Sequence, residues 1–127
     1  MRIIGDVHGK FDEYFKIISG CKKSIQLGDL GFNYPEIDLN HRFIAGNHDH
    51  HEKKYNCLNY LGDFGTYSNG YTYFFVSGGF SIDRCDRVEG VNWFQNEQLS
   101  YRQLGLAIEL YRQIKPDYVI SHECPYS

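Results

Sequence analysis

The stretch IAGNHDHH, from Ile44 to His51, places an amide, three histidines and a carboxylate directly after an apolar segment. Asparagine, histidine and aspartate supply the oxygen and nitrogen atoms that bind divalent metal ions, and histidine also transfers protons near neutral pH. The composition of this stretch predicts either a metal-dependent active site or a polar loop exposed to solvent. The rest of the chain has to distinguish the two.

Three further segments carry the same kinds of side chain: GDVHG with Asp6 and His8, GDLG with Asp29, and SHECP with His122. In extended backbone, alternate side chains point the same way, so Asp6 and His8 can bind one ion while Val7 points into the core. The two oxygens of a carboxylate such as Asp29 can bridge two cations. Each segment taken singly is also typical of a surface turn.

Hydrophobic periodicity predicts the elements that would position these side chains. Strands are expected over residues 2–4, 24–27, 41–45 and 118–120, and helices over residues 11–19, over residues 50–61 and around an apolar stripe that precedes Pro116. The Asn-Gly pair at residues 69–70 lies between β-forming residues and predicts a hairpin. Alternating strands and helices predict an α/β fold with at least one largely parallel or mixed sheet.

The candidate residues all follow predicted strands. Ligands of open α/β sheets bind at the carboxyl ends of the strands, so these four strand ends are expected to converge on one crevice.

Length and composition predict one domain over residues 1–127, since the chain has 127 residues, 42% apolar residues and a formal net charge of −3. That charge argues against a general polyanion binder, although nucleic acid is not excluded as a partner. The four cysteines form no C-x-x-C pair, which indicates reduced, mostly buried thiols in a cytoplasmic protein. No secretory signal or membrane-spanning segment is predicted.

In their residues and their order, the motifs GDVHG, GDLG, GNHD and SHECP closely resemble those of the calcineurin-like metallophosphoesterase family, over essentially the whole chain. This resemblance implies an αββα sandwich with mixed sheets. A fifth family motif, G-H-x-H, does not occur in the sequence. The domain is therefore expected to be C-terminally truncated relative to the family, with an uncovered sheet edge that favours self-association.

The resemblance also implies a metal-dependent phosphoric ester hydrolase in which a hydroxide held between two metal ions attacks phosphorus in line. His48 would act on the substrate phosphate, as an acid toward the leaving group or by stabilising charge. Asp49 joins it in the catalytic motif, where it would help hold the turn. The metal ligands that the resemblance implies are Asp6 and His8 for the first ion, Asn47 and His122 for the second, and Asp29 for both.

Mixed Asp, His and Asn ligands suit Mn, Fe, Zn, Co or Ni. Protein Ser/Thr phosphatases of the superfamily carry an Asp-Arg pair in the second motif and Glu after Asn-His, whereas this chain has Gly31-Phe32 and Asp49. A small phosphorylated substrate is therefore expected, and nucleotides are among the candidates. The substrate can be a phosphate monoester or a phosphate diester. The candidates for contacts with that substrate are His50, His51, Arg84 and Arg87. Otherwise the two histidines are solvated, and the two arginines pair with acidic neighbours at the surface.

Two alternatives remain open at this stage. The missing G-H-x-H ligands favour a catalytically impaired metal-binding or interaction module, although a scaffold has no need of the proton donor His48. The other alternative is an α/β protein with a surface histidine cluster and no metal, which requires the four ordered motifs to be coincidental.

Overall fold

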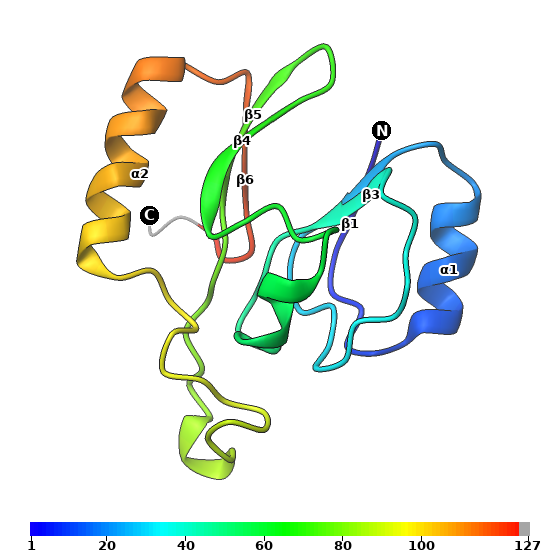
Figure 1. The fold of residues 1–127 in the computed structure, drawn as a ribbon, viewed down its shortest axis with the longest axis vertical. Coiled ribbons are helices and arrows are strands. Elements are labelled where there is room, and N and C mark those ends of the chain that lie inside the picture. The colour runs from blue at the N-terminus through cyan, green and yellow to red at the C-terminus, as the bar shows by residue number, and fades with distance from the viewer. Residues whose placement is uncertain (125–127) are drawn as a thin grey trace.

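The computed structural model describes residues 1–124 and contains two three-stranded sheets and two α-helices (Figure 1). A mixed α/β fold, as expected from the sequence, is confirmed. In chain order the elements are β1 (Arg2–Ile4), α1 (Phe11–Ser19), β2 (Ser24–Gln26), β3 (His41–Phe43), the 3₁₀ turn η1 (Lys53–Asn56), β4 (Phe64–Ser68), β5 (Thr72–Val76), the 3₁₀ turn η2 (Arg84–Asp86), α2 (Tyr101–Ile114) and β6 (Tyr118–Ser121).

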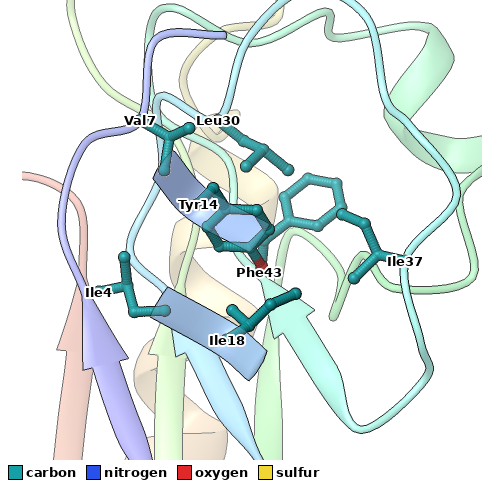
Figure 2. Close-up of a cluster of buried hydrophobic side chains, with 7 residues drawn as sticks. All are labelled: Ile4, Val7, Tyr14, Ile18, Leu30, Ile37 and Phe43. Atoms are coloured by element: carbon teal, nitrogen blue, oxygen red, sulfur yellow. The ribbon is translucent and has the colours of Figure 1, made fainter. Parts of the chain in front are cut away.

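The first sheet has the order β1-β2-β3, and all of its strands are parallel. Helix α1 packs on one face of this sheet because its buried residues, Tyr14 and Ile18, recur at helical spacing. Tyr14 and Ile18 form a cluster with Ile4, Phe43 and the loop residue Leu30, among others (Figure 2). This cluster anchors the loops that follow β1 and β2, because Val7 and Leu30 belong both to it and to those loops.

The second sheet has the order β4-β5-β6, with β4 antiparallel and β6 parallel to β5. The predicted hairpin is confirmed, with Gly70 in its turn at φ +96°. Side chains alternate along β5, so Phe75 packs with Ile25 of β2 and with Ile44, just after β3, whereas the Phe74 ring lies 5.4 Å from that of Tyr111 on α2. The two sheets therefore face each other across a shared apolar layer.

Helix α2 begins at a capping box in which Ser100 and Gln103 bond to each other's backbone N–H groups. It ends at Ile114, just before Pro116, as the sequence predicts. Helix α2 and strand β6, at the edge of the second sheet, leave large apolar side chains half exposed: Leu104, Leu106, Ile108, Tyr111, Tyr118 and Val119. Self-association through this edge stays a prediction.

The helix predicted over residues 50–61 is wrong. Only η1 forms there, because the His50 side chain accepts hydrogen bonds from the N–H groups of Glu52 and Lys53. Further along, Tyr60 forms a parallel bridge with Phe43, which an α-helix could not do. A long-range strand contact and a local side-chain bond therefore override the helical periodicity.

The cysteine prediction is correct only in part. Cys21, Cys57, Cys85 and Cys124 are free thiols, but Cys85 and Cys124 are exposed rather than buried. Among residues 1–124, neither helix has the length and apolar character that a bilayer crossing requires.

The packing of the two sheets predicts different costs for the same substitution on neighbouring strands. Ile25 and Ile3 are register partners, yet Ile25 is fully buried and Ile3 is 49% exposed. Removing a methyl group in Ile25→Val should lower the free energy of unfolding by about 1 kcal/mol, and Ile3→Val should lower it by much less. Urea denaturation of both variants measures this, and equal losses would contradict the packing of the second sheet against β2.

Candidate metal centre

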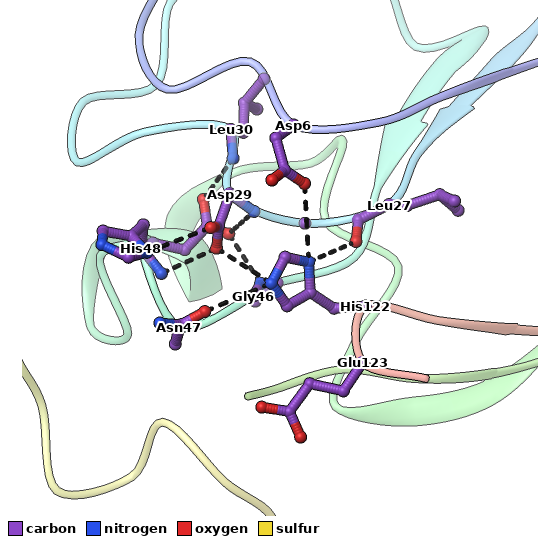
Figure 3. A network of polar contacts seen from close by, with 12 residues as sticks. Asp6, Leu27, Asp29, Leu30, Gly46, Asn47, His48, His122 and Glu123 are labelled. Atoms are coloured by element: carbon purple, nitrogen blue, oxygen red, sulfur yellow. Dashed lines mark hydrogen bonds and ion pairs between the residues drawn. The ribbon is translucent and has the colours of Figure 1, made fainter. Parts of the chain in front are cut away.

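The loops that follow β1, β2, β3 and β6 bring their polar side chains together at one end of both sheets (Figure 3). Two groups of side chains there could hold a metal ion: His8, Asp29 and His48, and Asp6, Asp29 and His122. The expected convergence of strand ends is therefore present. Three of the loops come from the first sheet, and the loop with His122 comes from the second.

Asp29 is common to both groups and is 3% exposed. Its Oδ2 lies 3.1 Å from Nδ1 of His48 and 3.6 Å from Nε2 of His8. Its Oδ1 lies 3.4 Å from Nε2 of His122 and accepts the backbone N–H of His48 at 2.8 Å. Oδ2 thus faces His8 and His48, and Oδ1 faces His122. A ligand that bridges two ions needs such an arrangement.

The tautomer of His122 follows from its neighbours. Nδ1 lies 2.9 Å from the backbone carbonyl of Leu27, which can only accept, so Nδ1 carries the hydrogen. In the neutral ring Nε2 then carries a lone pair, which faces Oδ1 of Asn47 (3.2 Å) and Oδ1 of Asp29 (3.4 Å). In that state three electron-pair donors converge without a hydrogen between them, and such a set of atoms fits a bound cation. A histidine N–H donated to a carbonyl is also the usual support of a metal-binding imidazole.

Asp6 and His8 reach the site by a different backbone path from the one expected. His8 has φ +48°, so the segment turns and is not extended, although Val7 is buried as predicted. Nε2 of His8 lies 3.5 Å from Oδ2 of Asp6, and Oδ1 of Asp6 lies 4.0 Å from Nδ1 of His122. Asp6 is therefore near both groups, and its side chain, 54% exposed, borders the open side of the site.

His48 lies within the cluster, with its Nδ1 at 3.1 Å from Asp29 and its ring centroid 5.2 Å from that of His8. Its side chain is 33% exposed, and Phe32 packs edge-on against it. Within residues 1–124, Nε2 of His48 makes no hydrogen bond, so this nitrogen can exchange a proton with a molecule entering the site.

Asp49 was placed with His48 in the catalytic motif and was expected to help hold the turn. Its carboxylate is fully buried and faces the backbone, as a turn-holding role requires. Oδ2 accepts the N–H groups of Asp29 and Gly46, both at 2.7 Å. Oδ1 accepts those of Leu30 and Gly31 and the hydroxyl of Tyr34. Burial raises the pKa of Asp49 to about 6, and the N–H donors oppose that rise. Asp49 is thus placed to position the two ligand loops rather than to touch a substrate.

Two glycines allow these loops to approach each other. A Cβ on Gly46 would overlap Oδ1 of Asp29, and a Cβ on Gly28, at φ +102°, would lie 2.7 Å from both the Gly46 nitrogen and Nδ1 of His122. Gln26, which the sequence reasoning missed, bonds to the backbone of Gly5 and Gly28 and so joins the first two loops.

His51 lies behind the site and is fully buried. The Lys54 ammonium donates to its Nδ1 at 2.8 Å, so Nε2 carries the hydrogen and donates to the Gly46 carbonyl at 2.8 Å. Burial lowers the pKa of His51 to about 3 and also lowers that of Lys54. His50 is buried beside the ring of Phe94, 4.5 Å away. Neither histidine is placed to line a substrate entrance, contrary to the expectation.

Arg84 was also predicted to contact substrate, yet it is exposed and its guanidinium lies 6.0 Å from the Trp93 ring. Arg87 is the arginine that reaches the site: it donates to the Asn47 carbonyl at 3.3 Å and lies over the Phe32 ring. Spacing could not separate these two arginines, because their segment has little regular structure.

No family model matches the chain, and no match is found among curated proteins or solved structures. What the structure itself contributes is two His and Asp groups, joined by Asp29, that could hold a metal ion.

The contact between the loops predicts a steric effect on metal binding. The methyl group of Gly46→Ala would displace Asp29, so affinity for Mn²⁺ should fall by about 10-fold or more. Gly5→Ala is the matched control, since a Cβ there meets no atom within 4 Å. Isothermal titration of both variants measures the affinities, and unchanged binding by Gly46→Ala would contradict the geometry.

Burial of neutral His51 predicts a pH dependence of stability. Its folded pKa of about 3 lies below the ordinary value of 6.5, so its contribution is present above pH 6.5 and is lost as the pH falls toward 3. His51→Gln keeps an N–H donor for Gly46 and does not titrate. Between pH 6 and 4.5, wild type should lose roughly 1 kcal/mol per pH unit relative to this variant. Parallel slopes in urea denaturation at several pH values would refute a neutral buried His51.

Proposed function

We propose that the chain is a metal-dependent phosphoric ester hydrolase of the calcineurin-like metallophosphoesterase type, with two divalent ions in its active site. The ordered motifs GDVHG, GDLG, GNHD and SHECP support the family assignment; Pro125 of the last motif lies outside the described residues. The packing of α1 on the first sheet, of that sheet on the second, and of α2 on the second is what an αββα sandwich requires.

The observation that carries the proposal is the buried carboxylate of Asp29, which lies between two sets of ligands. His8 is near one oxygen and His122 is near the other. A shared carboxylate is how proteins hold two cations about 3.5–4 Å apart. In this proposal Asp6 and His8 hold the first ion, and Asn47 and His122 hold the second.

When bound, the two cations would supply Lewis acidity, which neutralises phosphate oxygens and lowers the pKa of a water molecule. Among the chain's own residues, His48 borders the open side of the site and would donate a proton to the leaving oxygen. Its Nδ1 contact with Asp29 orients the ring, which leaves Nε2 for the substrate. Asp49 and the His51–Lys54 pair would keep the loops that carry the metal ligands in place while the ester is hydrolysed.

The exposure of the candidate ligands indicates the side from which a substrate would enter. Asp6 and His8 are about half exposed at the side chain, whereas Asp29 and His122 are 5% and 11% exposed. A phosphate group would thus approach from the side of Asp6 and His8, beside the ring of Phe32. We propose a small phosphorylated molecule, nucleotides included, and Mn, Fe, Zn, Co or Ni as the metal.

A second candidate function is a metal-binding module without turnover. The observation that favours it is the 3.1 Å contact between His48 and Asp29, because a histidine held in the ligand cluster can serve as one more ligand instead of a proton donor.

Metal content and hydrolysis, measured on the same samples, test these candidates. Protein loaded with Mn²⁺ is assayed with p-nitrophenyl phosphate and bis-p-nitrophenyl phosphate. The hydrolase proposal expects near two ions per chain, and a loss in kcat of about 100-fold or more in His48→Ala without loss of metal. His41→Gln is the matched control, since His41 lies at the opposite end of β3 and bonds to Ser24.

The outcomes separate the two candidates. Bound metal without turnover in wild type would favour the module, and lower metal content in His48→Ala would make His48 a ligand. Absence of bound metal would reject both.

A further inference from the structure

We infer that Ser81 is a positioning residue for the site: it holds the Asn47 amide with its oxygen toward His122. This inference rests on the proposed metal site in assigning Asn47 as a ligand, but the orientation itself is a property of the metal-free chain. Ser81 follows the Gly-Gly pair at residues 78–79 and has no exposed surface. No other part of the proposed function uses it.

The hydrogen-bonding capacity of the Ser81 hydroxyl is completely used. A hydroxyl offers one hydrogen and two lone pairs. The hydrogen goes to Oε2 of Glu97, 2.6 Å away, because a carboxylate only accepts. One lone pair accepts from the Arg87 guanidinium, which only donates. The remaining lone pair can therefore accept one more hydrogen bond, but the hydroxyl has no hydrogen left to donate.

Asn47 fills this last position. Its Nδ2 lies 3.3 Å from the Ser81 oxygen, which leaves Oδ1 at 3.2 Å from Nε2 of His122. Rotating the amide by half a turn would place Oδ1 against a lone pair of Ser81 and direct an N–H toward the ion position. Only the observed orientation offers a metal-binding oxygen, since the amide nitrogen has no free electron pair for a cation.

Buried charges keep the hydroxyl from reversing its polarity. Glu97 is 4% exposed and the Arg87 side chain is 5% exposed, so they lie on either side of Ser81 in a medium of low dielectric constant. Glu97 also accepts the backbone N–H of Ser81 at 2.9 Å, and Arg87 donates to the Asn47 carbonyl. Asp83 lies 3.6 Å from Arg87 and so adds a further carboxylate to this group.

The first test compares metal affinity in two backgrounds. Ser81→Ala should weaken the binding of one Mn²⁺ ion by about 10- to 100-fold and leave the other ion nearly unchanged, because outer residues that orient ligands have effects of this size. In Asn47→Asp the two side-chain oxygens are equivalent, so adding Ser81→Ala should change affinity little. An equal loss in both backgrounds would overturn the inference, because Ser81 would then act only through packing.

Two controls separate orientation from general damage. Ser81→Thr keeps a hydroxyl at Cβ and should restore at least part of the affinity. Ser24→Ala removes a hydroxyl of equal burial at the far end of β2 and should leave both affinities unchanged. A loss in Ser24→Ala equal to that in Ser81→Ala would count against a specific role of Ser81.

The second test needs no metal. In ¹⁵N-labelled metal-free protein, the side-chain amide protons of Asn47 should show nuclear Overhauser effects to the Hβ protons of Ser81. Effects to the Hε1 proton of His122 in their place would overturn the inference. If wild type binds no Mn²⁺ while the Ser81 contacts are present, the proposed function fails and the orientation of Asn47 by Ser81 stands.

Discussion

The candidate site depends on the buried carboxylate of Asp49, which bonds to the backbone and is not one of the candidate metal ligands. Asp49 accepts four backbone N–H groups and a tyrosine hydroxyl, and those N–H groups belong to the loops after β2 and β3. Burying a charge without such partners would cost several kcal/mol, so the two loops are stable only in the arrangement that supplies these donors. Asp29 takes its left-handed conformation, φ +57°, inside this arrangement.

Assembly of the site is therefore coupled to packing of the whole chain. The loops after β1 and β2 are held by Val7 and Leu30 in the core beneath α1. His122 arrives from the second sheet, which meets the first through Phe75 and Ile120. No isolated element could bring His122 to Asp29, so ligand convergence is a consequence of sheet packing, and metal binding would add to folding stability.

Two clusters of charged side chains adjoin the candidate metal ligands. Lys54 is held by His51 and Asp63, and Arg87 and Glu97 meet at Ser81. Paired charges in a protein interior contribute little net stability, but each one dictates which atoms around it donate and which accept. Here Lys54 determines the tautomer of His51, which lies behind Gly46. In our inference Arg87 and Glu97 determine the orientation of Asn47 through Ser81. Directional bonds of this kind explain why so many polar groups of a small protein are buried.

The sequence by itself determined the α/β class, the strands that precede Asp6, Asp29, Asn47 and His122, and the Asn-Gly hairpin. These features are local: they follow from periodicity and turn chemistry within a few residues. Only the tertiary structure decided which loops Asp49 joins, that His51 is directed inward, which of the two candidate arginines, Arg84 and Arg87, reaches the site, and that residues 50–61 form no helix. Each of those outcomes depends on a contact between distant segments, such as Phe43 with Tyr60 or Ser81 with Glu97. The burial of a polar side chain is decided by the partners that the fold brings to it, and neighbouring residues in the sequence do not encode those partners.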